Sequence, residues 1–352
     1  MSWGLVGLEK PTACLSTLLL DGRLPHAILF TGPTGCGKNS LARTLAAALN
    51  CAGPNPDASP CGHCLSCRKM ARDLHPDLIT LDPGGEEGRP KEENAPPEPR
   101  KDAPKSRRQI SIGEVRELRR VMALRPFEGR VKVFILREAD RLGREAATAL
   151  LKTLEEPPPD SALFLTTAVE GLVLPTIRSR CLTLRLTPLP LETVLLTLAE
   201  QRRIDGPQAR LLAALSGGAL GSALSGDPEA VWDRWQTLNR IMGAGRPEEG
   251  LALAWRWASA LAEDRTGWSE ALNLLRLWWR ETLRLAALGP DGPEGPPPQQ
   301  SQFLWAARLT PGIQEQSVRA LDRLAEGLER VPRKPELFWV NYWLSVLQPG
   351  RA

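Results

Sequence analysis

The chain has 352 residues, enough for two or three domains, and its 42% hydrophobic and 24% charged residues are ordinary for a water-soluble protein. Its formal net charge of +4 and pI near 8.7 are compatible with a nucleic-acid neighbour but too mild to establish one. No apolar run approaches membrane-spanning length and no secretory signal pattern opens the chain, so we expect a cytoplasmic protein without membrane contact.

A glycine-rich segment, Gly-Pro-Thr-Gly-Cys-Gly-Lys, runs through residues 32–38. The apolar residues 28–30 before it predict a buried strand, and residues 40–48 after it predict a helix. This is the context of a P-loop, in which backbone N–H groups and a helix N-terminus hold phosphates. The alternative is a glycine-rich turn that binds nothing. The expected residues for binding ATP or ADP are Gly32, Gly35, Gly37 and Lys38.

The residues that hold magnesium in an intact P-loop protein are altered. The motif ordinarily ends in Lys-Ser or Lys-Thr, whose hydroxyl coordinates the ion, but this chain has Asn39, and Ser40 is rotated about 100° further around the helix. A second apolar strand at 131–136 is followed by Arg137, where an aspartate ordinarily completes the metal shell. A guanidinium repels a divalent ion, so we expect no hydrolysis. The alternative is that Arg137 points away and Asp140 supplies the carboxylate.

Four of the seven cysteines lie in one segment, residues 51–67, which is rich in glycine and proline. They are Cys51, Cys61, Cys64 and Cys67. Their short spacing lets one tetrahedral ion gather all four thiolates, which suits zinc, and a shell closed by four ligands favours a structural role over a catalytic one. A disulfide cluster would need an oxidising compartment, which nothing in the N-terminal sequence indicates. His63 and His75 are alternative ligands, although the four cysteines suffice.

The rest of the first half alternates between helices and strands. Residues 146–156 carry apolar positions at helical spacing before three prolines stop the helix, and residues 162–167 predict another buried strand. That strand ends at Thr167, where a phosphate-sensing polar residue would sit. Residues 82–109 mix proline with charges of both signs and predict a disordered insertion. An amphipathic helix is expected from Ile112.

After Pro188 the pattern is helical throughout. Residues 189–226 predict a small helical domain, and residues 227–352 predict a larger one that contains ten of the eleven tryptophans. Aromatic side chains can stack on nucleic-acid bases, but helical periodicity favours packing within this domain or against other subunits.

Five phrases carry a specific family resemblance. They are residues 24–27 (Leu-Pro-His-Ala), the P-loop, residues 75–78 (His-Pro-Asp-Leu), residues 150–158 (Leu-Leu-Lys-Thr-Leu-Glu-Glu-Pro-Pro) and residues 177–181 (Ile-Arg-Ser-Arg-Cys). Together they resemble the clamp-loader subunits of bacterial DNA polymerase III, which are AAA+ proteins. The resemblance implies an α/β P-loop module over residues 1–188 with an inserted zinc loop, a small helical lid domain and an all-α collar domain that oligomerises.

The resemblance also implies a role for each altered position. In that family the motor subunits keep their metal and sensor residues, whereas a stator subunit has a decayed nucleotide site. Asn39 and Arg137 fit the stator, and so does Gly221, which stands where a motor subunit has an arginine that contacts the γ-phosphate. The Ser-Arg-Cys motif implies that Arg180 is an arginine finger for a neighbour's ATP site; the alternative is an ordinary surface arginine.

The expected partners are therefore the other subunits of a hetero-oligomeric clamp loader, the sliding clamp and primed DNA. Zinc is the expected structural metal, and ATP or ADP can bind without being hydrolysed. Two alternative functions stay open: a self-sufficient ATPase motor subunit, and a zinc-containing DNA-binding module with a relic P-loop.

Overall fold

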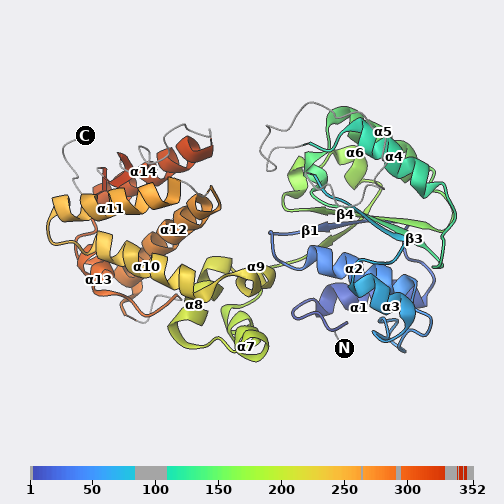
Figure 1. Cartoon of the computed structure of the whole chain (residues 1–352), viewed down its shortest axis with the longest axis horizontal. Coiled ribbons are helices and arrows are strands. Elements are labelled where there is room, and N and C mark those ends of the chain that lie inside the picture. The colour runs from blue at the N-terminus through green and yellow to red at the C-terminus, as the bar shows by residue number, and fades with distance from the viewer. Residues whose placement is uncertain are drawn as a thin grey trace. The chain divides into compact units, whose positions relative to one another are not determined.

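The computed structural model describes residues 3–83, 109–262, 265–290, 295–329, 339, 341–343 and 345–346 (Figure 1). The chain forms two compact units, Met1–Leu189 and Pro190–Ala352. Most of the predicted insertion at 82–109 lies outside the described residues. Apart from its first residue, the predicted lid (189–226) falls in the second unit, as does the predicted collar (227–352), and the separation of the two stays a prediction. Among the described residues, no helix is both long enough and apolar enough to span a bilayer.

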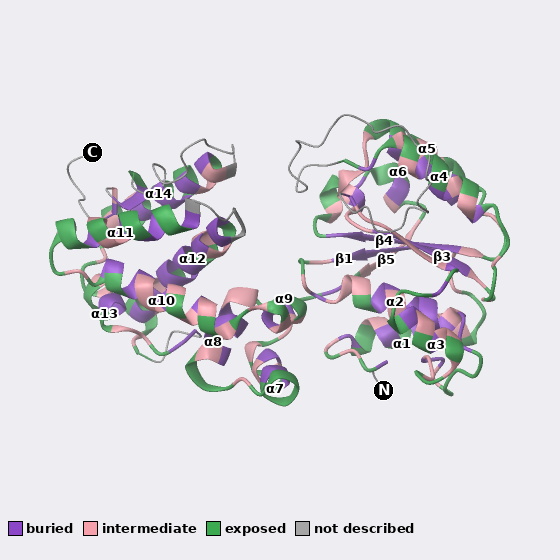
Figure 2. Cartoon of the chain, in the orientation of Figure 1, coloured by how far each residue is buried: buried purple, intermediate pink, exposed green. Residues whose placement is uncertain are grey.

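The first unit is built on a five-stranded parallel sheet in the order β2-β3-β4-β1-β5. Its strands are β1 (Ala27–Thr31), β2 (Leu78–Leu81), β3 (Lys132–Leu136), β4 (Ser161–Thr167) and β5 (Leu182–Arg185). The three central strands are buried almost throughout, as Figure 2 shows in purple. Strands covered on both faces need continuous apolar runs, which is why the sequence pattern reveals them.

Helices cover both faces of this sheet (Figure 1). One layer contains α1 (Glu9–Leu20), α2 (Lys38–Leu49) and α3 (Leu65–Ala71), and the other contains α4 (Ile112–Met122), α5 (Arg144–Glu155) and α6 (Pro175–Arg178). Beneath α4 and α5 lies an apolar core. Its fully buried members include Leu29, Val115, Phe134, Leu150, Leu163 and Leu165. On the opposite face α2 packs against β1, β3 and β4.

Local sequence signals fix the ends of these helices. Ser111 caps α4 by accepting from the backbone N–H of Glu114, whose carboxylate accepts in return from the Ser111 N–H, and this reciprocal pair stabilises the helix start. The prolines that begin at Pro157 follow the C-terminal end of α5, where no helical N–H is required.

The second unit is helical. Its elements are α7 (Leu191–Arg202), α8 (Gly206–Ser216), α9 (Leu220–Ser225), α10 (Pro228–Met242), α11 (Pro247–Ala262), α12 (Arg265–Leu288), α13 (Gln300–Ala306) and α14 (Pro311–Glu329). Trp278, Trp279 and Trp305 contact one another edge to face, with ring centroids 5.1 to 6.3 Å apart. Trp235 and Trp278 are fully buried. The prediction that tryptophans pack inside this region is confirmed for these residues.

Candidate functional site

The glycine-rich segment forms a strand–loop–helix unit, as predicted. The loop leaves β1 at Thr31, and α2 begins at Lys38 with Gly37 before it in the left-handed conformation, at φ +87°. A side chain at Gly32 would place its Cβ 2.3 Å from the carbonyl oxygen of Leu186, so only glycine fits this turn. Lys38 Nζ donates to the carbonyl oxygens of residues 32 and 33 at 2.6 and 2.7 Å. The lysine is thus folded back over the loop.

Two acidic residues that follow β3 lie within electrostatic reach of this lysine. Burial lowers the pKa of Lys38, and the negative charges of Asp140 and Glu138 partly oppose that shift, which places both acids within electrostatic reach of the ammonium group. The hydroxyl of Thr167, at the end of β4, donates to Asp140 Oδ1 at 2.6 Å. The structure therefore brings Thr167 and Asp140 together beside the P-loop.

Arg137 points in another direction. Its Nη1 donates to Asp82 Oδ2 at 2.5 Å, and Asp82 directly follows the neighbouring strand β2. Burial lowers the pKa of Arg43 of α2, and the positive charge of Arg137 lowers it further, so the two guanidinium groups are within electrostatic reach of each other. These contacts direct the Arg137 side chain toward Asp82, and the alternative in which Asp140 supplies the carboxylate stays a prediction. The two positions that ordinarily hold the metal are nevertheless Asn39 and Arg137.

The proposed finger, Arg180, lies in the turn between α6 and β5. Its side chain is 37% exposed and pairs with Glu155 of α5 at 2.7 Å. Its Nη1 also donates to the carbonyl oxygen of Thr176 at 3.0 Å. None of the contacts described for Arg180 reaches the P-loop of its own chain. Gly221, the third altered position, lies in α9 of the second unit.

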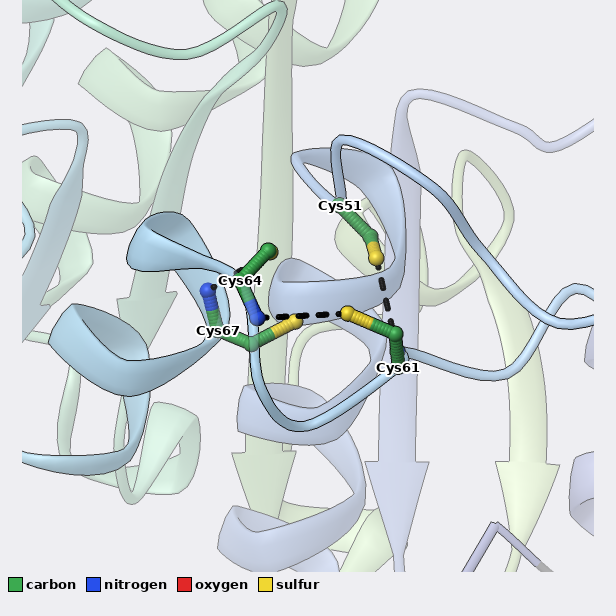
Figure 3. Close-up of side chains that lie close together, drawn as sticks. All are labelled: Cys51, Cys61, Cys64 and Cys67. Carbon is green, nitrogen blue, oxygen red and sulfur yellow. Dashed lines mark hydrogen bonds between the residues drawn. The ribbon is translucent and has the colours of Figure 1, made fainter.

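The four cysteines of residues 51–67 converge, as predicted (Figure 3). Their sulfur atoms all lie within 4.8 Å of one another. Zinc–sulfur bonds of about 2.3 Å in a tetrahedron require sulfur atoms about 3.8 Å apart, so the cluster is compact enough for one ion. Backbone N–H groups of Cys61, Cys64 and Cys67 donate to the preceding sulfur of the set, each at 3.4 Å. The residues present fit a four-thiolate metal shell.

The surroundings of the sulfur atoms favour thiolates at two positions. Burial raises the pKa of the Cys64 thiol, but backbone N–H groups of Cys67 and Ala52 outweigh it and lower that pKa to about 6. Hydrogen bonds from the backbone of Cys64 and His63 lower the pKa of Cys61. Burial raises the pKa of Cys67. Metal ions bind the thiolate form, so two of the four ligands are already biased toward it.

Two polar side chains, one before and one after the cysteine segment, bind the backbone of residues 127–131. Sequence reasoning did not predict these contacts. Asp77 is fully buried, and its carboxylate accepts from the backbone N–H groups of residues 127, 128 and 129 at 2.7 to 2.8 Å. Asn50 Oδ1 accepts from the N–H groups of residues 130 and 131 at 2.8 and 3.0 Å. The phrase His-Pro-Asp-Leu flagged Asp77 as family-like, but its partners are fifty residues away in sequence.

Replacing Asp77 by alanine is expected to lower the free energy of unfolding by about 3 kcal/mol, because three backbone N–H groups lose a charged acceptor that is itself buried. The pKa of Asp77 is lowered: burial raises it, but the three backbone hydrogen bonds prevail. A carboxyl with a depressed folded pKa contributes stability above its unfolded pKa of about 3.9 and loses it as pH falls further. Urea unfolding at neutral pH should therefore show the full difference, which shrinks below about pH 4.

Asp21→Ala is the matched control, since Asp21 is exposed at the end of α1. It should change the unfolding free energy by no more than about 0.5 kcal/mol. Equal stability of Asp77→Ala and the wild type at neutral pH would contradict the assigned role.

A parallel sheet whose first strand leads through a glycine loop into α2 defines an α/β P-loop fold. The family model for the DNA polymerase III delta subunit matches residues 7–190. The delta' subunit of DNA polymerase III from Escherichia coli K12 is 32% identical over 269 residues, which cover 76% of this chain and 71% of that one. The chain belongs to this family of clamp-loader AAA+ proteins.

Other relatives are longer than this chain. The tau subunit of the same Escherichia coli strain is 34% identical over 260 residues, and the gamma/tau subunit of Mycobacterium tuberculosis H37Rv is 39% identical over 178. These matches cover 71% and 50% of this chain but 36% and 27% of the relatives. The match thus spans about a third of their length. The solved structure of a gamma subunit-related protein from Thermotoga maritima is 18% identical to this chain, with a TM-score of 0.47. The match covers 94% of this chain and 98% of that one.

Proposed function

We propose that this protein is the delta-prime stator of a bacterial clamp loader, which assists ATP-dependent loading of the sliding clamp on primed DNA without hydrolysing ATP itself. One observation carries the proposal: the P-loop cradle is present, but its metal-binding aspartate is replaced by Arg137, which is tied to Asp82. Asn39 removes the second metal ligand. A phosphoryl transfer site depends on the metal ion to neutralise developing charge, so these changes disable turnover rather than phosphate binding.

Arg180 is proposed to act in trans. A guanidinium offers a rigid fork of donors that suits phosphate oxygens, and an arginine supplied by a neighbour stabilises the charge that spreads over the transferring group. The Arg180 side chain is partly exposed, and none of its described contacts is with the P-loop of its own chain, which supports a role across a subunit boundary.

The four cysteines are proposed to hold one structural zinc ion. They connect the end of α2 to α3, because Cys51 follows α2 closely and Cys67 lies within α3. A closed shell of four thiolates supplies folding energy and leaves no position for a reacting water.

The proposed partners are the gamma/tau and delta subunits, with the clamp and primed DNA reached within the assembly, in the bacterial cytoplasm and without membrane contact. Mixing the purified chain with gamma/tau and delta should give a defined hetero-oligomer on size-exclusion chromatography. If the chain enters no such assembly, the proposed stator function is wrong.

A second function, a hydrolysing gamma/tau-like motor subunit, is favoured by one contact. The carboxylate of Asp140 accepts from the Thr167 hydroxyl, and its negative charge acts on Lys38, so a carboxylate lies within electrostatic reach of the P-loop lysine. Phosphate release by the isolated chain separates the two functions.

We expect the isolated chain to release no phosphate above background from ATP with magnesium, because the metal lacks its hydroxyl and its aspartate. The measurement is a phosphate-release assay with Lys38→Ala as the reference for background. Turnover by the wild type that disappears in Lys38→Ala would instead establish the motor function.

A further inference from the structure

We propose that Glu155 is a positioning residue for Arg180 and holds its guanidinium in one orientation at the protein surface before a neighbouring subunit docks. The inference rests on the proposed function, because an oriented guanidinium matters only if Arg180 acts on a neighbour's ATP. The contact is direct: Arg180 Nη2 donates to Glu155 Oε1 at 2.7 Å. Among the contacts described for Arg180, Glu155 supplies the one anionic group.

The geometry leaves part of the guanidinium free for a ligand. Besides Glu155, the group contacts the Thr176 carbonyl oxygen at 3.0 Å and the Ser179 hydroxyl at 3.5 Å, both through Nη1. An arginine has five N–H donors, and these contacts use three. Thr176 and Ser179 belong to the same short segment as Arg180 and move with it. Glu155 is therefore the contact that fixes the guanidinium relative to the rest of the first unit.

The backbone at Glu155 is anchored through its neighbour Leu154. It is the last residue of α5, and the preceding Leu154 is buried in the core beneath that helix. The ring of His26, directly before β1, hydrogen-bonds the Leu154 carbonyl oxygen through Nε2 at 3.0 Å. The end of α5 is thus fastened to the strand that carries the P-loop.

Glu155 stands at a position that is electrostatically unfavourable for an acidic residue, the C-terminal end of a helix. A helix C-terminus carries partial negative charge, so an acid in the last turn is unfavourable there and a base is preferred. Glu155 nevertheless ends α5, and Arg180 supplies the compensating positive charge from α6 and its following turn. Residues that violate a local preference while serving a tertiary contact are candidates for a functional role.

The effect of losing this contact follows from side-chain freedom. Arginine has many rotamers, and a finger that is not held must be ordered when the subunits meet. We expect Glu155→Ala to lower hydrolysis at the facing site about two- to tenfold. Glu155→Gln, which keeps an oxygen acceptor, should recover part of the loss, and Glu155→Lys should fall below the alanine variant.

The experiment reconstitutes the full clamp-loader complex with wild-type chain, Glu155→Ala, Arg180→Ala and the double variant, and compares DNA-stimulated hydrolysis. Because Glu155 acts through Arg180, the double variant should equal Arg180→Ala alone. The matched control is Glu156→Ala, which removes the same charge from the next, exposed residue and should leave the rate unchanged. On the isolated chain, an arginine-specific dicarbonyl reagent should modify Arg180 faster in Glu155→Ala than in Glu156→Ala, as measured by peptide mass spectrometry.

The outcomes separate this inference from the proposed function. If Arg180→Ala lowers hydrolysis while Glu155→Ala changes neither hydrolysis nor reagent reactivity, the positioning role is wrong and the stator function stands. Additive losses in the double variant would also overturn it, since Glu155 would then act by itself. If Arg180→Ala has no effect, the proposed action of Arg180 in trans and the positioning role of Glu155 are both wrong.

Discussion

Replacing Arg180 by alanine is expected to lower ATP hydrolysis by the assembled clamp loader while zinc content, folding and assembly stay intact. An arginine finger typically contributes a factor of about 10³ to 10⁵ at the site it serves. Only the site that faces this subunit loses its finger, so the total rate of a complex with several motor sites falls less. Clamp loading should suffer more, since it requires the sites to act together. The measurement compares DNA-stimulated hydrolysis and clamp loading in complexes reconstituted with wild-type and variant chains.

Two variants sharpen this test. Arg180→Lys should rescue poorly, because one ammonium group cannot reproduce the planar fork of a guanidinium. Arg178→Ala is the matched control: it removes an arginine two residues earlier that lies 3.8 Å from Glu170. Unchanged hydrolysis and unchanged loading in the Arg180→Ala complex would leave Arg180 as an ordinary surface residue.

The central sheet was largely predictable from sequence, and its edges were not. The strands around Phe30, Phe134 and Phe164 are apolar runs buried on both faces, and such runs stand out against their polar surroundings. β2 and β5 have four residues each and are only partly buried, so their sequence pattern is too short to separate from a loop. β2 pairs with β3 and β5 pairs with β1, and these pairings depend on tertiary structure that the sequence pattern does not specify.

The candidate sites also contain parts that the sequence predicts and parts that it does not. The P-loop and the cysteine cluster are local in sequence, because short spacing alone forces Cys61, Cys64 and Cys67 together. The ion pair between Arg137 and Asp82 joins residues 55 positions apart, and no spacing rule specifies it. Charge reasoning predicted that Arg137 disfavours a metal ion, but only the sheet order shows which carboxylate it meets.

Contacts around Arg137 also explain how the chain tolerates a cation at this position. Asp82 neutralises Arg137, and Asp73 pairs with the nearby Arg43 of α2. Each of these guanidinium groups therefore has its own carboxylate, so neither depends on a bound phosphate for charge balance.

Removing the metal from the cysteine cluster is expected to unfold the segment around residues 51–67 while the sheet remains intact. This segment has few apolar residues, and small zinc modules derive about 10 to 16 kcal/mol of apparent binding energy from the ion, which is also their folding energy. Elemental analysis of the purified chain should find about one zinc per molecule, because one shell takes four thiolates.

The variant Cys64→Ser should lose most of this zinc. Cys64 is both a proposed ligand and the N-cap of α3, where its sulfur accepts from the Cys67 N–H, so the variant should also expose α3 to amide hydrogen exchange. Cys14→Ser is the control, since Cys14 is exposed on α1 away from the cluster. A chain that contains no zinc and whose four cluster thiols react freely with a thiol reagent would rule the site out. Protection of α3 that depends on zinc, with the P-loop helix unchanged, would instead establish that the ion stabilises this segment and takes no part in phosphate chemistry.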